Sequence, residues 1–243
     1  MDRMQPRIVG FGLMAVLGVL GLTATPASAS LLRPGAGRAY PDIAGDINGK
    51  VTYSYDPATQ TGIFHVTNTP YLVAGGSSSS LEYLVAPNAD TGIRSQEIKL
   101  LLDRNGQLLA SDQNLYELYG TIVANGYTYS GLLLKGVPTA FGAQDLGGVG
   151  VTGADLFDVT VDITGGALAD HFGSEAYIRI APELASTFQG RFDEDFSAAK
   201  ATSNTRTYNA PIPFPIPEPS ALALIALGLS GTALSHHRRR RSR

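Results

Sequence analysis

Apolar and polar residues alternate along much of this chain, and that alternation constrains the fold more than any other feature. The pattern is clearest in Val51–Tyr55, Ile63–Thr67 and Phe157–Ile163, and every second residue is apolar from Ile98 to Leu102. Because successive side chains of a strand point to opposite faces, the pattern predicts strands with one buried and one solvent-facing side. The first two segments are expected to pair as antiparallel strands around a turn at Asp56–Pro57.

Asn-Gly pairs supply the turn signals, because both residues tolerate the positive φ that tight turns require. The three pairs are Asn48–Gly49, Asn105–Gly106 and Asn125–Gly126. The last pair lies directly between two strand-like segments, 121–124 and 127–130, so we predict a two-residue hairpin there. The second arm is expected to continue through Leu132–Leu134 and to end at Gly136–Pro138.

Little of the chain has the apolar spacing of a helix. Tyr177–Ile180 indicates a further strand, and residues 193–200, with acids first and a lysine last, suit either a short helix or an irregular edge. With 28 glycines, 14 prolines and 16% charged residues, the composition also favours strands and turns. We therefore predict a mainly β fold of about eight short strands, forming a single antiparallel β-sandwich or jelly-roll-like domain.

The N-terminal residues have the three-part order of a secretory signal peptide. Arg3 and Arg7 precede an apolar stretch, Ile8–Leu22, which is followed by a polar segment ending in Ala27-Ser28-Ala29. Small residues at Ala27 and Ala29 fit the pockets of signal peptidase, so cleavage after Ala29 is expected. An uncleaved N-terminal anchor is the alternative.

The C-terminal residues form a second three-part device. Prolines at every second position from Pro211 to Pro219 forbid a helix and favour an extended neck. The apolar run Ala221–Leu234 follows; as a helix its 14 residues measure about 21 Å, less than the roughly 30 Å of a bilayer core. A basic cluster that includes Arg238, Arg239, Arg240, Arg241 and Arg243 ends the chain and is expected to stay cytoplasmic as a membrane stop.

The segment between these two ends is acidic and lacks cysteine. Between Ser30 and Pro219 there are 11 Lys and Arg residues against 20 Asp and Glu residues, a net charge of −9. Nucleic acid is therefore an unsuitable partner, since binding it requires a basic face. The absence of cysteine excludes disulfides, thiol nucleophiles and Cys-ligated zinc.

The C-terminal device resembles the PEP-CTERM sorting signal of exported proteins from exopolysaccharide-producing Gram-negative bacteria. The resemblance rests on Ile216, Pro217, Glu218 and Pro219, on the apolar segment after them and on the terminal arginines. The first motif position is more often Val in the family, whereas the Pro-Glu-Pro residues match. The resemblance implies recognition and processing by exosortase, a membrane enzyme, and we expect Glu218 to be a recognition contact. A plain tail anchor with a proline spacer is the alternative.

These features divide the precursor into four parts: a signal peptide (1–29), an exported β-rich domain (30–210), a Pro-rich neck (211–219) and a hydrophobic segment with an Arg-rich tail (220–243). A signal helix and a C-terminal hydrophobic helix would thus flank the β domain. The precursor is expected to be exported through the inner membrane, tethered transiently on its periplasmic side, and then placed on the cell surface or outside the cell. Signal peptidase, exosortase and the membrane are its expected partners, with exopolysaccharide as a further candidate.

The core offers few candidates for chemistry. His65 and His171 are expected to be surface histidines, and no Gly-x-Ser-x-Gly motif supports a hydrolase. Asp193, Glu194 and Asp195 are weak candidates for binding Ca²⁺, with a solvated charge run as the default. We therefore predict no catalytic residues, no cofactor and a non-enzymatic surface or matrix protein. A carbohydrate-binding module, suggested by 11 tyrosines on an acidic domain, is the alternative, and an exported hydrolase ranks third.

Overall fold

The computed structural model describes residues 31–32, 40–76, 81–146, 155–184 and 186–207. Within these ranges the chain forms eleven strands and one short helix. In chain order they are β1 (Asp42–Gly45), β2 (Gly49–Asp56), β3 (Thr61–Asn68), β4 (Pro70–Ala74), β5 (Glu82–Leu84), β6 (Ser95–Asp103), β7 (Leu115–Ala124), β8 (Tyr127–Asp145), β9 (Asp155–Gly165), α1 (Ala169–Phe172), β10 (Glu175–Leu184) and β11 (Phe196–Thr207).

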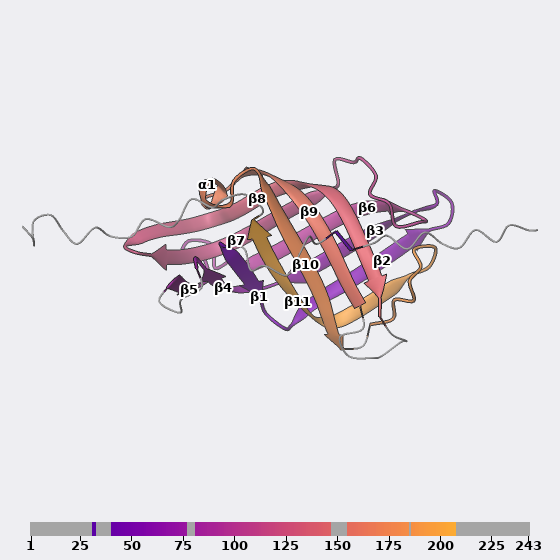
Figure 1. Ribbon diagram of the computed structural model, residues 1–243, viewed down its shortest axis with the longest axis horizontal. Coiled ribbons are helices and arrows are strands. Elements are labelled where there is room, and N and C mark those ends of the chain that lie inside the picture. Colours follow the sequence, from indigo (N-terminus) through magenta and orange to yellow (C-terminus); the bar gives the residue numbers. More distant parts are fainter. Residues whose placement is uncertain (1–30, 33–39, 77–80, 147–154, 185, 208–243) are drawn as a thin grey trace, which may run out of the picture.

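Eight of these strands close into an antiparallel barrel (Figure 1). The strands follow one another in the order β10, β9, β8, β7, β6, β3, β2 and β11, and β11 pairs again with β10 to complete the ring. The mainly β, antiparallel prediction is therefore confirmed, whereas the sandwich or jelly-roll arrangement is wrong. The reason is physical: a sandwich keeps two separate sheets with free edges, and here the β10–β11 pairing removes the edge.

The remaining three strands, β1, β4 and β5, lengthen one side of the barrel. β2 pairs with the first part of β11, at Phe196–Ala201, and β1 pairs with its last part, at Asn204–Arg206. β4 lies beside β1 and β5 beside β4, and the bridge between Ala86 and Thr121 joins this extension to β7. The wall thus continues from β2, β3 and β6 toward the tip of the β7–β8 hairpin (Figure 1).

The register of the strands defines two ends of the barrel. The terminal end holds the β7–β8 hairpin tip, the start of β1 and the last residues of β11 (Figure 1). The opposite end holds the ends of β2, β6, β8 and β10, together with segment 186–195, which leads into β11. Asp42 is opposite Arg206, so the described chain enters and leaves the barrel on adjacent strands.

An aromatic cluster fills the barrel near the opposite end. Phe157 of β9 and Phe196 of β11 stack with their ring centroids 5.9 Å apart, and Phe188 lies 4.7 Å from Phe196. Phe64 of β3 and Phe192 also belong to this cluster, and each of the five side chains is at most 4% exposed. The alternation in the sequence produces this core, because it turns every second residue of each strand inward.

Several predicted elements are confirmed. The segments around residues 51–55 and 63–67 form the antiparallel pair β2–β3, and those around 98–102, 157–163 and 177–180 lie in β6, β9 and β10. The hairpin turn is also confirmed: Ala124 is opposite Tyr127, and both Asn125 (φ 53°) and Gly126 (φ 86°) adopt positive φ.

Two boundaries differ from the prediction. β8 does not end at Gly136–Pro138 but runs on to Asp145, because bulges in its pairing with β9, between Lys135 and Gly136 and between Pro138 and Ala140, accommodate these residues. The helix alternative for residues 193–200 is wrong from Phe196 onward, where β11 begins. Burial of Phe196 in the aromatic cluster outweighs the weak dipole preference that suggested a helix.

The expected wet face of β9 is interrupted at Asp158. Its side chain is fully buried, and Arg179 of β10 donates two hydrogen bonds to it, of 2.8 Å and 2.9 Å. This bidentate contact raises the pKa of Arg179 and gives the carboxylate a charged partner. The pair therefore fastens β9 to β10 beside the seam that closes the barrel.

A layer of buried polar side chains crosses the barrel interior. Gln96 of β6 donates to the Thr205 hydroxyl (3.0 Å) and accepts from the Ser203 hydroxyl (2.6 Å), both on β11. The Tyr116 hydroxyl of β7 also donates to Thr205, at 3.1 Å. Burial raises the pKa of Tyr116 well above its usual range, so this donor stays protonated. The layer ties β6 and β7 to β11 across the inside of the barrel.

Gln96→Leu is expected to destabilise the protein more than Tyr116→Phe. The first change removes two hydrogen bonds and leaves the buried Ser203 hydroxyl without its acceptor, for a loss of about 2–4 kcal/mol. The second leaves the Gln96–Thr205 bond in place and is expected to cost about 1 kcal/mol. Urea unfolding followed by tyrosine fluorescence measures both, and equal losses would contradict a connected layer.

Candidate functional site

The residues that the sequence assigns to sorting lie outside the described ranges. These are the cleavage residues Ala27 and Ala29, the motif Ile216–Pro219, and Arg238, Arg239, Arg240, Arg241 and Arg243. In the described part of the chain, no helix is long and apolar enough to cross a membrane. The structure instead defines the point from which the C-terminal segment starts, at the end of β11.

An ion pair holds that point in place. Nε of Arg206 donates to Oδ2 of Asp42 at 2.8 Å, and the two side chains are only 15% and 9% exposed. β11 also pairs with β10 as far as Thr207, so its last residues are bound on both sides. A charge pair this shielded from water is costly to break, because removing one partner leaves the other charge poorly solvated. The last residues of β11, 204–207, are thus held in place where the C-terminal tail begins.

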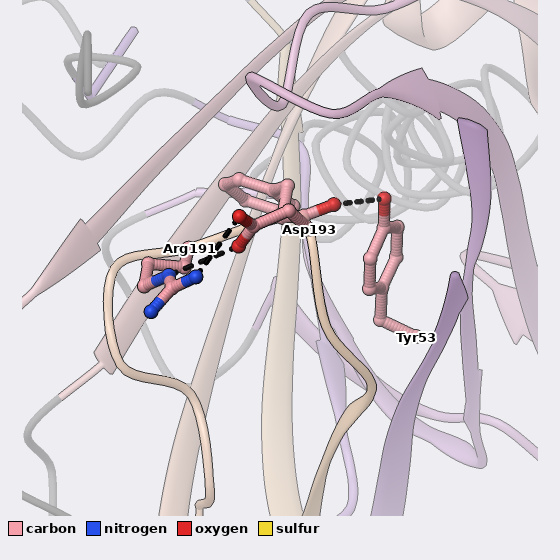
Figure 2. Close-up of polar contacts among 4 residues, drawn as sticks. Tyr53, Arg191 and Asp193 are labelled. Carbon is pink, nitrogen blue, oxygen red and sulfur yellow. Dashed lines mark hydrogen bonds and ion pairs between the residues drawn. The ribbon is translucent and has the colours of Figure 1, made fainter. Parts of the chain in front are cut away.

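At the opposite end, residues 186–195 form what we call the closing segment. Its Phe188 and Phe192 side chains are 2% and 4% exposed and lie in the aromatic cluster. Figure 2 shows Tyr53 beside this segment: its buried hydroxyl donates to the carbonyl of Phe192 at 2.9 Å. Burial raises the pKa of Tyr53, which keeps the hydroxyl protonated and able to donate.

The three acids proposed as weak Ca²⁺ candidates lie at the end of this segment and do not form a common ligand set. Asp193 accepts two hydrogen bonds of 2.9 Å from Arg191, which lower its pKa (Figure 2). Asp195 accepts a hydrogen bond of 2.7 Å from the backbone amide of Tyr55, and Glu194 is exposed. Across the described residues, no group of three or more His, Cys, Asp or Glu side chains is arranged to hold a metal ion.

A different pair of acids meets beside the closing segment. Asp145, the last residue of β8, is opposite Asp155, the first residue of β9. Asp155 is 1% exposed; burial raises its pKa, the Ser186 hydroxyl opposes that shift and the neighbouring Asp145 adds to it. Sequence reasoning missed this pair, because the two residues are ten positions apart and neither lies in a recognised motif.

The two core histidines have separate surroundings. His65 lies on the outer face of β3, as expected, with Nε2 2.9 Å from Glu97 Oε1. The expectation of a surface position is wrong for His171, which is 8% exposed in α1 and lies 3.0 Å from the Tyr129 hydroxyl. The packing of α1 against β8 and β9 buries it, and the Tyr129 hydroxyl is within hydrogen-bond distance of its ring.

Comparison with known proteins identifies one segment of the chain. Residues 215–240 match the PEP-CTERM protein-sorting motif, which confirms the resemblance seen in the sequence. The motif implies an exported protein that is sorted by exosortase. No significant match was found among curated proteins or among solved structures.

Gly106→Ala is expected to destabilise the closing segment. Gly106 has φ +77°, and a Cβ there would lie 2.5 Å from the Phe192 ring, so the change adds both backbone strain and displacement of a buried side chain, about 2–4 kcal/mol in all. Gly126→Ala is the matched control: φ is +86° but nothing lies within 4 Å, so only the strain of about 1 kcal/mol remains. Chemical unfolding compares them; equal losses would contradict tight packing at Gly106.

Arg206→Ala is expected to loosen the end of β11. It leaves Asp42 without this charge partner, for a loss on the order of 3 kcal/mol, and speeds amide hydrogen exchange at residues 204–207. Arg191→Ala, which breaks the exposed pair with Asp193 at the other end of the barrel, should leave exchange at 204–207 unchanged. Unaltered exchange in Arg206→Ala would show that the strand pairings alone hold the exit point.

Proposed function

We propose that this chain is the precursor of a non-enzymatic surface or extracellular-matrix protein, which exosortase recognises through the C-terminal tail. The match of residues 215–240 to the PEP-CTERM motif carries the proposal. The signal-peptide pattern at residues 1–29 supplies the route out of the cytoplasm, and the barrel is the part delivered.

The position of the exit point supports processing of the tail. β11 ends at the terminal end of the barrel, and 13 residues separate Thr207 from the apolar run that begins at Ala221. The alternating prolines favour an extended chain, and at about 3.1 Å per residue 13 residues in that conformation would reach about 40 Å. That length gives a membrane enzyme access to Pro217–Pro219 without disturbing the barrel.

A non-enzymatic role is supported by how the barrel interior is filled. In one part of it, aromatic side chains pack against one another. In another part, Gln96 forms hydrogen bonds with Ser203 and Thr205. The two core histidines lie on different elements, one paired with Glu97 and the other with Tyr129. An exported hydrolase therefore ranks below a structural or binding role.

Carbohydrate binding is the second candidate, and the exposure of particular tyrosines favours it. Tyr71 on β4 and Tyr127 at the hairpin tip are 45% and 54% exposed, whereas Tyr53, Tyr116 and Tyr177 are buried. Exposed aromatic rings with a hydroxyl suit the faces and edges of sugar rings. If Tyr71→Ala and Tyr127→Ala leave retention on exopolysaccharide from the producing strain unchanged, these rings are not a sugar site.

Glu218→Gln and deletion of Pro217–Pro219 are expected to block processing of the tail. In cells with active exosortase, the mature wild-type protein should lack its C-terminal arginines, whereas both variants should accumulate as membrane-bound precursor. Intact-mass spectrometry of the isolated protein gives the answer. Glu194→Gln, which changes an exposed acid in the closing segment, is the control and should be processed normally. A wild-type mass that still ends in Arg243 contradicts the proposal.

A further inference from the structure

The pairing of Asp145 with Asp155 places two carboxyl groups on one face of the β8–β9 ladder. Residues directly opposite each other in antiparallel strands share a face, and here each is the terminal residue of its strand. Their environments differ: Asp145 is exposed and Asp155 is 1% exposed. The pair therefore joins a solvent-accessible carboxylate to a buried one.

Among the residues that the structure describes, the buried Oδ1 of Asp155 has no hydrogen-bond partner. Native proteins rarely leave a buried carboxylate oxygen unsatisfied, because the charged group loses its water and gains nothing in return. The arginines on neighbouring elements do not compensate it: Arg191 is engaged by Asp193 and Arg179 by Asp158. Burial first, and then the charge of Asp145 and a hydrogen bond to it, raise the pKa of Asp155, so holding both carboxyl groups ionised costs free energy that a bound cation would offset.

The closing segment touches the pair at two places. The buried Ser186, at its start, lies beside Asp155 and shifts that carboxyl group's pKa, and Gly190 lies against Asp145, since a Cβ there would be 3.7 Å from Oδ2. Gly190 has φ +72°, a conformation that brings the backbone close without a side chain between them. An ion bound by the pair would therefore also hold the closing segment.

We propose that Asp145 and Asp155 bind one Ca²⁺ ion, through the unpaired Asp155 Oδ1 and the Asp145 carboxylate. Ca²⁺ prefers hard oxygen ligands in flexible geometry and commonly completes its shell with water, which the exposed side of Asp145 admits. The ion neutralises the two carboxylates and satisfies the buried oxygen. In a chain without disulfides, it would fasten β8 and β9 at the end of the barrel that the closing segment covers.

Calcium titration of the full-length protein in detergent tests this site. With calcium affinities typical of extracellular modules, about 10⁻⁴–10⁻³ M, we expect saturable binding of one Ca²⁺ per chain by isothermal titration calorimetry. At a free concentration ten times the dissociation constant, Tm should rise by about 3–6 °C relative to NaCl of equal ionic strength.

Asp155→Asn and Asp145→Asn should each weaken calcium binding at least tenfold and remove the rise in Tm. Asp162→Asn, an exposed acid on the same strand, is the matched control and should bind like wild type. Asp145→Asn keeps the test decisive if the buried substitution prevents folding, because Asp145 is exposed.

Absence of saturable binding to the wild-type protein overturns the proposal, as does equal binding by wild type and both Asn variants. A wild-type protein that ignores Ca²⁺ but becomes more stable as the pH falls would show instead that the two carboxyl groups share a proton. Failure of exosortase processing has no bearing on this result, since the site lies wholly within the barrel.

Discussion

The pairing of β10 with β11 is the interaction on which the rest of this structure depends. It closes the ring, so that no strand among the eight keeps a free edge. It also gives β11 three partner strands, because β11 pairs with β10 on one side and with β1 and β2 on the other. The Ser203 and Thr205 side chains of β11 belong to the buried polar layer. The closing segment leads into the first residue of this strand, and the exit point is at its last residue.

Local features of this fold could be predicted from the sequence, whereas closure could not. Alternation in residues 51–55 and 63–67 identifies β2 and β3, and Asn125–Gly126 identifies a turn, because each depends on near neighbours. A sandwich and a barrel share that alternation. The difference depends on the contact of β10 with β11 and on bulges that let β8 bend past Pro138, which no short-range pattern specifies.

The candidate sites also differ in whether they depend on residues that are adjacent in sequence or on residues that only the fold brings together. The PEP-CTERM motif is linear, so Pro217, Glu218 and Pro219 identify it directly. The acids at 193–195 were candidates for binding Ca²⁺ because they are adjacent in sequence. In the structure, however, Asp193 accepts hydrogen bonds from Arg191, and Asp195 accepts one from the Tyr55 amide. Asp145 and Asp155 come together only through the β8–β9 register, and the burial that distinguishes Asp155 is a property of the folded barrel.

The attachment of the tail to β11 has a mechanical consequence. Tension applied at Thr207 along the strand axis acts parallel to β11, whose hydrogen bonds to β1, β2 and β10 run across it. Such a load shears many bonds together instead of opening them one by one. A barrel held at the cell envelope by this strand would therefore resist the drag of flowing liquid better than one attached through an edge strand that can peel away.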